Sequence, residues 1–290
     1  VVNAELASCE SAKRAMRRPV FSKFANMGEG VNSRFAEVNP VFSGDGKTIV
    51  FTRKMQFYDA VFISTIKSDG TWSAPYNLTP EFGLDGNSYS TGVSFNGDEV
   101  YVYRSDNFDG NIYSSKKTDG KWSTLVKLND NINTKYWESH ASISADGQHL
   151  YFTSNRKGGY GGLDIYRSTR TAKGDWGPAV NLGPAVNSVY NEETPFISPR
   201  DNKLYFSSLG HGSIGGYDIY ISERTSASKW SKPVNMGYPF NITDDDLFFC
   251  PVDIADITGV RSDYVEENTY GLKDIYLVEV YHGNFPRNYT

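Results

Sequence analysis

The sequence predicts an all-β fold, a five-bladed β-propeller built from four-stranded antiparallel blades. Three observations predict it. An Asp-Ile-Tyr element recurs every 51 to 56 residues, a tryptophan follows a polar turn in most repeats, and the N-terminal segment copies the outer strand that the last repeat lacks. The segments between turns alternate with a period of two, which is typical of strands, whereas helical repeats show a period of 3.6. A unit of this length with four short strands indicates a propeller blade.

The third strand of each predicted blade contains the Asp-Ile-Tyr element or a variant of it. Its copies are Ala60-Val61-Phe62, Asn111-Ile112-Tyr113, Asp164-Ile165-Tyr166, Asp218-Ile219-Tyr220 and Asp274-Ile275-Tyr276. The aspartate follows a turn, where a carboxylate can accept hydrogen bonds from the turn amides. We therefore predict a structural role for this aspartate.

The other strands are marked by turns and by the outer-strand motif. Asp-Gly turns such as Asp45-Gly46 and Asp146-Gly147 join the first strand to the second, and this dipeptide is a strong hairpin signal. A second turn leads to the tryptophan and then to an Asn-Leu pair in the fourth strand. These markers are Trp72, Trp122, Trp176 and Trp230, followed by Asn77-Leu78, Lys127-Leu128, Asn181-Leu182 and Asn235-Met236.

The two ends of the chain predict how the ring closes. The fifth repeat lacks its fourth strand, whereas Asn26-Met27-Gly28 lies one repeat before Asn77-Leu78. The N-terminal segment therefore supplies the outer strand of the last blade, which removes an exposed edge. We expect a helical segment over residues 1–19, the propeller over 20–281, and a tail over 282–290 that leads toward a further domain.

Composition excludes several classes of function. The net charge is −5 and the pI is about 5.5, which argues against a nucleic-acid surface and against docking on anionic lipid. The sequence contains no run of 18 apolar residues, so no transmembrane segment is predicted. The two cysteines, Cys9 and Cys250, lack the spacing of a zinc site. They could form one disulfide between the N-terminal segment and the last blade, or remain two buried thiols. No cofactor or metal is predicted.

Acidic residues recur at the start of the predicted innermost strands. Counting five residues back from the end of each of these strands gives Ser88 in the second repeat and an acid in the others, namely Glu37, Glu138, Glu192 and Asp244. Such a ring at one mouth of the channel can attract a cation or a basic peptide. The alternative, which repetition favours, is that each carboxylate accepts backbone hydrogen bonds from a neighbouring blade.

Aromatic residues accumulate on the loops that lead into the innermost strands. Trp137 lies outside the register of the repeated tryptophans, and Tyr89 and Tyr190 occupy similar loops. Together they predict an aromatic mouth for a peptide or a glycan.

Catalytic signatures are weak. Some propellers hydrolyse glycosides with two carboxylates at a defined separation, and Glu138 with Glu192 or Asp244 would be candidates. Acid and base roles require distinct environments, however, and here the carboxylates recur at equivalent positions. We therefore expect a protein without catalytic activity and keep a glycosidase-type enzyme as an alternative.

The repeats resemble the WD-like, TolB-type propellers of OmpA-family outer-membrane lipoproteins of the Bacteroidota. The resemblance is strongest over residues 154–166, 211–218 and 241–249. It implies a periplasmic, outer-membrane-associated scaffold or adaptor that binds envelope proteins, most specifically those of the type IX secretion system. Peptidoglycan would be bound only through a domain outside this sequence. The second hypothesis is a peptide- or glycan-binding module at the channel mouth.

Overall fold

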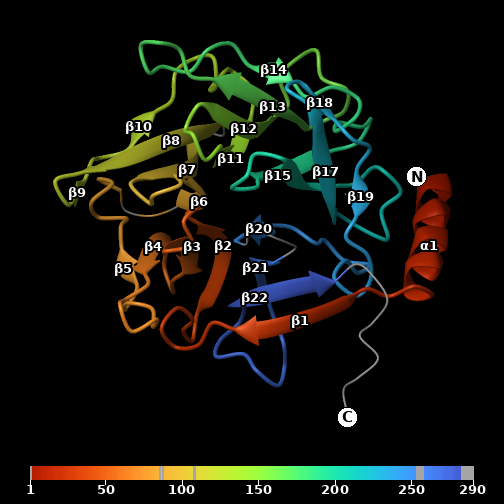
Figure 1. The fold of residues 1–290 in the computed structure, drawn as a ribbon, viewed down its shortest axis with the longest axis horizontal. Helices are drawn as coiled ribbons and strands as arrows, with labels where there is room; N and C mark the ends of the chain where they lie inside the picture. The colour runs from red at the N-terminus through yellow and green to blue at the C-terminus, as the bar shows by residue number, and fades with distance from the viewer. Residues whose placement is uncertain (1, 85, 87, 107–108, 253–257, 282–290) are drawn as a thin grey trace.

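A computed structural model describes residues 2–84, 86, 88–106, 109–252 and 258–281. These residues form one helix and five antiparallel sheets arranged as blades around a central channel (Figure 1). The predicted five-bladed propeller is confirmed. The predicted tail over 282–290 lies outside the described residues.

The first two blades follow the chain from the inside of the ring to the outside. Blade 1 contains β2 (Ala36–Phe42), β3 (Thr48–Lys54), β4 (Asp59–Thr65) and β5 (Tyr76–Asn77). Blade 2 contains β6 (Ser88–Val93), β7 (Glu99–Asp106), β8 (Asp109–Thr118) and β10 (Val126–Lys127), with β9 (Lys121–Trp122) paired to β8.

Blades 3 and 4 repeat this order. Blade 3 contains β11 (Glu138–Ile143), β12 (His149–Ser154), β13 (Asp164–Thr169) and β14 (Val180–Asn181). Blade 4 contains β15 (Glu192–Ile197), β16 (Lys203–Ser208) and β17 (Asp218–Ser226), with β18 (Lys229–Trp230) and β19 (Val234–Asn235) both paired to β17.

Blade 5 combines the two ends of the described chain. From the inside outward it contains β20 (Cys250–Pro251), β21 (Thr258–Asp263), β22 (Asp274–Tyr281) and β1 (Phe21–Asn26). Strand β1 pairs antiparallel with β22 over six residues. The predicted closure of the ring by the N-terminal strand is therefore confirmed.

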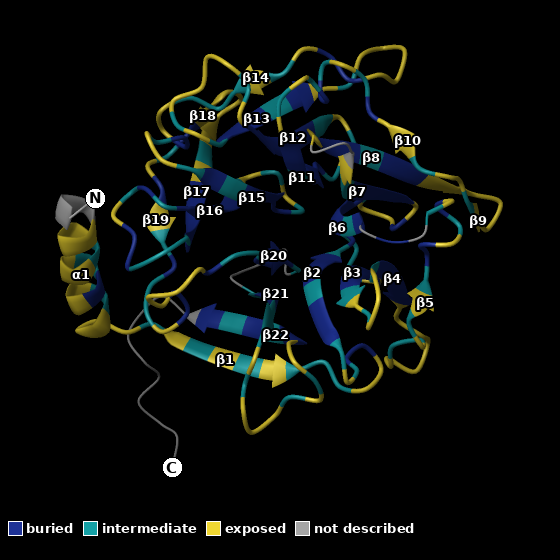
Figure 2. Cartoon of the chain, turned by 180° about the vertical axis from the view of Figure 1, so that it is seen from behind, coloured by how far each residue is buried: buried dark blue, intermediate teal, exposed yellow. Residues whose placement is uncertain are grey.

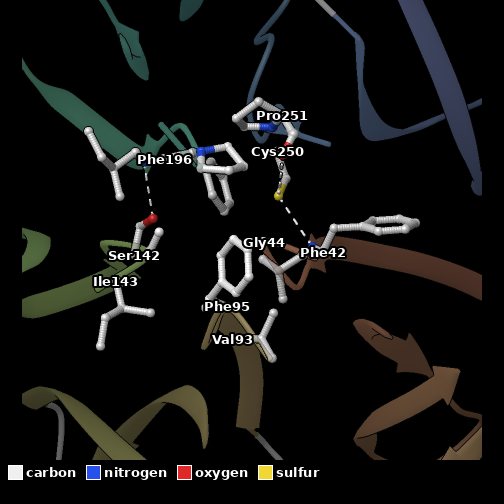
Figure 3. Close-up of a pocket in the computed structure, with 14 residues that line it drawn as sticks. Phe42, Gly44, Val93, Phe95, Ser142, Ile143, Phe196, Cys250 and Pro251 are labelled. Carbon is white, nitrogen blue, oxygen red and sulfur yellow. Dashed lines mark hydrogen bonds between the residues drawn. The ribbon is translucent and has the colours of Figure 1, made fainter. Parts of the chain in front are cut away.

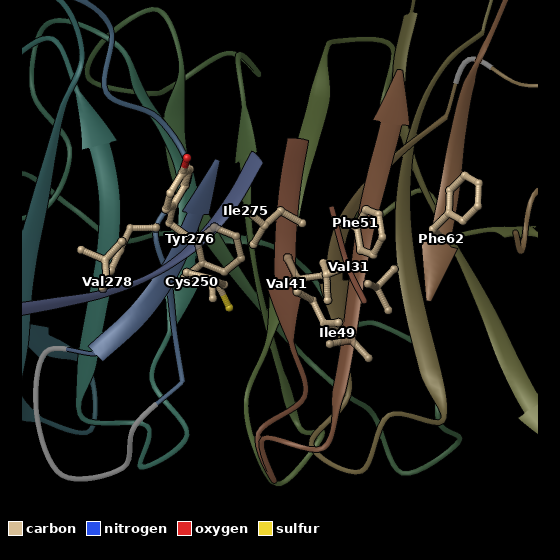
Figure 4. Packing of buried hydrophobic residues seen from close by; sticks show 14 of the residues in the cluster. Val31, Val41, Ile49, Phe51, Phe62, Cys250, Ile275, Tyr276 and Val278 are labelled. Carbon is tan, nitrogen blue, oxygen red and sulfur yellow. The ribbon is translucent and has the colours of Figure 1, made fainter. Parts of the chain in front are cut away.

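Apolar side chains fill the space between blades and hold the closing blade to the first one. Figure 4 shows Ile275, Tyr276 and Val278 of β22 in the same cluster as Val41 of β2 and Phe51 of β3. All five side chains are buried, as the dark interior of Figure 2 illustrates. Because burial of apolar area is the main favourable contribution to folding, this cluster makes the last blade part of a single ring.

Helix α1 (Val2–Met16) precedes β1 and lies at the side of the propeller beside β19 (Figure 1). Pro19 follows it, and a proline favours an extended conformation in the residue before it. Most of its described side chains are exposed, and Ala12 is the buried one among them. The helix is not long and apolar enough to span a membrane, and it is the sole helix among the described residues.

Asparagine and aspartate side chains explain why the outer-strand motif and the Asp-Ile-Tyr element recur together. In blades 3 to 5 the outer-strand asparagine donates to the aspartate of the third strand. The pairs are Asn181–Asp164 at 2.7 Å, Asn235–Asp218 at 2.5 Å and Asn26–Asp274 at 2.7 Å. The same aspartates accept turn amides, for example that of Gly161 at 2.9 Å, which confirms their predicted structural role.

In blades 2 to 5 a second asparagine joins the outer-strand loop to the third strand. In blade 3, Asn187 accepts the amide of Ile165 at 2.8 Å and donates to its carbonyl at 3.0 Å. The equivalents in blades 5, 2 and 4 are Asn32 with Ile275, Asn133 with Ile112 and Asn241 with Ile219, and in blade 1 the hydroxyl of Thr79 accepts the amide of Val61. The side chain takes the place of a strand partner, which is why an outer strand of two residues suffices.

The carboxyl group of Asp218 is expected to make stability depend on pH. Its Oδ2 accepts the amide of Ile214 at 2.6 Å as well as Asn235, whereas its buried Oδ1 has no hydrogen-bond partner among the described residues. Burial is the main cause that raises the pKa of Asp218 to about 6. The folded state therefore binds this proton more tightly than the unfolded state does.

Stabilisation by this protonated carboxyl is fully present below about pH 4, near the unfolded pKa of an aspartate, and is lost as the pH rises to about 6. We expect the unfolding free energy of the wild type, relative to Asp218→Asn, to fall by about 3 kcal/mol across that interval. Urea titrations of both proteins at several pH values measure this difference. Parallel stability curves would contradict the assigned protonation.

Candidate functional site

The predicted acidic ring lies inside the protein rather than on its surface. Glu37, Glu138 and Glu192 are fully buried at the start of β2, β11 and β15. Each accepts the backbone amide of the residue four positions earlier, as Glu138 does from Thr134 at 2.8 Å. These carboxylates therefore stabilise the loop that connects two blades, which is the structural interpretation that repetition favours.

An arginine completes this interaction in two of these blades. Arg156 donates to Glu138 at 3.3 Å and to the carbonyl of Ile132 at 2.7 Å. Arg53 makes the equivalent pair of contacts with Glu37 and Val31. In blade 4 His211 approaches Glu192 to 3.9 Å instead. Burial raises the pKa of Glu37, and the hydrogen bond from Ser33 and the charge of Arg53 oppose that shift.

The prediction that Asp244 belongs to this ring is wrong by two positions. Asp246 is the buried carboxylate of blade 5, and it accepts from Arg261 at 2.8 Å, whereas Asp244 is exposed. The sequence count started from Phe249, but Cys250 and Pro251 are the residues that pair with β21. The two phenylalanines before Cys250 resemble the apolar end of an inner strand, so the count back to the acidic residue began two positions too early.

The two cysteines are not joined. Cys9 is exposed on α1, and Cys250 is buried beside the channel, where its sulfur accepts the amide of Phe42 at 3.3 Å. The predicted disulfide is therefore wrong for this structure, and of the alternative pair of buried thiols only Cys250 is buried. Burial raises the pKa of the Cys250 thiol to about 12, so it stays protonated at neutral pH.

The channel narrows at the end where the first strand of each blade turns into the second. Figure 3 shows Phe95, Val93, Ile143, Phe196 and Cys250 converging there. A cavity of about 30 Å³ remains between them, which is room for a water molecule. We call the opposite end of the channel the mouth.

At the mouth two of the three predicted aromatic residues, Tyr89 and Trp137, belong to a chain of packed rings. Tyr89 packs on Tyr103 with ring centroids 6.0 Å apart, and Tyr103 packs on Trp137 at 5.4 Å. His140 lies 6.3 Å from Tyr103 and 5.2 Å from Phe248. The predicted Tyr190 is exposed, on the loop between β14 and β15, where its carbonyl accepts the amide of Gly162 at 3.2 Å.

Carboxylates border these rings. Asp59 accepts the hydroxyl of Tyr89 at 2.6 Å, and Glu193 accepts the hydroxyl of Tyr217 at 2.6 Å. Burial raises the pKa of Tyr89 to about 12, and the bond to Asp59 contributes to that shift. Burial also raises the pKa of Glu193. The mouth thus combines flat apolar surfaces with fixed hydrogen-bond acceptors.

A repeated backbone distortion positions the residue that faces the channel. Asn39, His140, Thr194 and Phe248 all have positive φ, between 49° and 62°, at the same place in blades 1, 3, 4 and 5. In blades 1, 3 and 4 the register of the inner strand shifts there. Burial lowers the pKa of His140 to about 4, so that its imidazole is neutral at pH 7 and 3.9 Å from Glu193. Backbone strain of this kind concentrates at functional sites.

Sequence reasoning missed Tyr103, His140, Glu193, Tyr217 and Phe248 at the mouth. Tyr103 lies in the middle of β7 and His140 in β11, where the sequence reads as ordinary strand. One available signal was a second acidic residue directly after the glutamate of the acidic ring, as Glu193 follows Glu192. It was missed because only one acid was assigned to each blade.

Large exposed apolar residues gather on the loops of the mouth face. These loops connect the second strand to the third and the fourth strand to the next blade. Ten of the exposed large apolar residues of the described chain lie on them: Phe57, Tyr58, Trp137, Tyr160, Val189, Tyr190, Ile242, Tyr264, Tyr270 and Leu272. On the loops of the opposite face the same set contains two, Ile66 and Phe95. An accumulation of this kind is typical of an interaction surface.

Comparison with known proteins identifies the fold. The sequence matches no model of a known protein family and no curated protein. Among solved structures, a TolB protein from Agrobacterium tumefaciens is 17% identical over 87% of this chain and 78% of its own, with a TM-score of 0.50. An α-L-arabinofuranosidase from Lactobacillus brevis is 12% identical over 92% of this chain and 100% of its own, with a TM-score of 0.55.

A thermostable family-43 glycoside hydrolase is also similar, with 12% identity over 88% of this chain and 93% of its own and a TM-score of 0.52. At these identities the similarity shows a shared propeller fold and nothing about the reaction or the ligand.

Proposed function

We propose that this propeller is a non-catalytic scaffold that binds a protein partner through its mouth face. The observation that carries the proposal is the uneven distribution of exposed apolar side chains, ten on the mouth face against two on the opposite face. Aromatic residues at the centre of an interface commonly contribute most of the binding energy, and the ring chain around Trp137 and Tyr103 lies at the centre of this face.

The partner class is an envelope protein of an outer-membrane-associated complex in the periplasm, with the type IX secretion system as the specific case. The resemblance of the repeats to outer-membrane lipoprotein propellers and the shared fold with TolB support this placement. The buried state of Glu37, Glu138 and Glu192 supports a role without catalysis, because these carboxylates have structural partners and no exposure to a substrate.

A glycan-binding module, and with it a glycosidase-type enzyme, is the second candidate, since two structurally similar propellers act on glycosides. Trp137 with the acceptors Glu193 and Asp59 would suit a sugar ring, because an aromatic face stacks on its apolar side and carboxylates accept from its hydroxyls. Saturable binding to a glycan array, or release of a sugar from any member of it, would favour this candidate over the scaffold.

Two valine variants test the scaffold. Val189 on the mouth face and Val180 on the outer strand of the same blade are 76% and 58% exposed. We expect Val189→Glu to reduce the capture of envelope proteins from a detergent-solubilised envelope extract at least fivefold, because a charge within an apolar interface must be desolvated. The matched Val180→Glu should leave capture unchanged. Equal loss in both variants, or in neither, would contradict the assignment of the face.

A further inference from the structure

Blade 5 is incomplete on its mouth side. In blades 1 to 4 the inner strand pairs with the second strand from its first residue onward, as Glu138 does with Ser154 and Glu192 with Ser208. In blade 5 the pairing is limited to Cys250 with Val260 and Pro251 with Gly259. The mouth half of β21, at Ser262 and Asp263, has no inner strand beside it within the described chain.

A cavity of about 320 Å³ opens at this place. Its walls come from β21, from the irregular segment before β20 and from β2 of blade 1, with Leu247, Phe248, Ser262, Asp263, Val38 and Asn39 among the lining residues. Pockets that hold small ligands start at about 300 Å³. The cavity is therefore large enough for one side chain and the backbone that carries it.

The charges around the cavity favour a cation. Asp244, Asp245 and Asp263 line it, and Asp246 is neutralised by Arg261 at 2.8 Å. Lys273 is the other cation of the lining. Three carboxylates against one ammonium leave the cavity with negative charge, and Phe248 adds an aromatic wall on which a cation can rest.

Arg261 places a charged side chain in the wall of the cavity. Its side chain is 8% exposed and lines the cavity, at a position that phenylalanine occupies in β3, β12 and β16. Its Nη atoms donate to the Phe240 carbonyl and to Asp246. Its Nε has no hydrogen-bond acceptor among the described residues, although it lies 3.3 Å from Asp263. Asp246 and Asp263 are therefore the ionic partners of this guanidinium.

We propose that this cavity binds an extended segment of the partner protein that carries an arginine or lysine. The segment lies along the free edge of β21 in place of the missing inner strand, as peptides do that extend a sheet. Its basic side chain lies against Asp263 and Asp244. This assignment rests on the proposed scaffold function and specifies the chemistry that the mouth face recognises.

Two labelled peptides of alternating threonine and valine test the proposal. One has an arginine at the centre, and the other has norleucine there. Fluorescence anisotropy with the whole chain should show saturable binding of the arginine peptide, at least tenfold tighter than that of the norleucine peptide and weakened by salt. The Asp263→Asn variant should weaken binding of the arginine peptide at least fivefold. Its amide oxygen can still accept the hydrogen bond from the Tyr264 amide.

Asp119→Asn is the matched control, because Asp119 lies at a turn of the opposite face with a positive φ of 51° that asparagine tolerates. It should leave binding unchanged. The proposal is overturned if the arginine peptide shows no saturation up to about 1 mM, a weak affinity on the usual scale. Equal affinity for the two peptides, or insensitivity to Asp263→Asn, overturns it as well.

Capture from the envelope extract separates this proposal from the scaffold function. If Asp263→Asn leaves capture intact while Val189→Glu abolishes it, the mouth face binds a partner without using the cavity, so that the cavity assignment fails and the scaffold stands. If neither change affects capture, both fail.

Discussion

Replacing Glu138 with alanine should lower the free energy of unfolding by about 3 to 5 kcal/mol, the usual cost of removing one partner from a buried ion pair. The carboxylate accepts from Thr134, from the Ser154 hydroxyl at 2.7 Å and from Arg156. Without it the largely buried guanidinium has no counter-charge, and the loop between blades 2 and 3 loses its anchor. Urea denaturation monitored by tryptophan fluorescence measures the change.

Two further variants make this result interpretable. Glu266→Ala removes an exposed carboxylate of a loop and should change stability by less than about 0.5 kcal/mol. Replacing both partners, as Glu138→Leu with Arg156→Met, should recover part of the loss, because an apolar pair needs no desolvated charge. A loss below about 1 kcal/mol in Glu138→Ala would show that the carboxylate is not essential to the joint between blades.

Removal of residues 1–26 should abolish cooperative folding, whereas removal of residues 1–18 should not. The longer deletion takes β1 away from β22 and exposes Val278 and Val280, which are buried beneath it. It also removes the amide of Asn26 that donates to Asp274. An open blade with an unpaired apolar edge favours aggregation over folding.

The shorter deletion takes away α1, whose described side chains are mostly exposed, and should lower the melting temperature by less than about 5 °C. Scanning calorimetry compares the two proteins, and a synthetic peptide of residues 19–33 added to the longer deletion should restore a cooperative transition. A longer deletion that melts within a few degrees of the intact chain would contradict closure by β1.

The sequence was sufficient for the architecture because a repeat reports the same structural requirement several times. The copies of Asp-Ile-Tyr and of the outer-strand asparagine marked opposite ends of one hydrogen bond, as in Asn181 with Asp164. The copy of the outer-strand motif at Asn26-Met27-Gly28 located the closing strand, and Asn32 in the loop after it bonds Ile275 in the same way as Asn187 bonds Ile165.

The site was less predictable because it depends on where the repeat fails. Asp244 was chosen for an acidic ring that in fact contains Asp246, because the count started at Phe249 whereas the inner strand of blade 5 ends at Pro251. Tyr103 and His140 come from neighbouring blades and their rings pack together, and no local pattern in the sequence records such a contact. Trp137 was recognisable because it departs from the repeated tryptophan register.

Photo-cross-linking inside native cells tests the central claim, that the mouth face is the binding face, most directly. Benzoylphenylalanine in place of Phe57, which is 87% exposed on the mouth face, should form a covalent adduct with a partner protein on irradiation. The same group in place of Val126, 61% exposed on the outer edge of blade 2, should form none. An adduct at Val126 with none at Phe57 would place the partner on the rim and contradict the account.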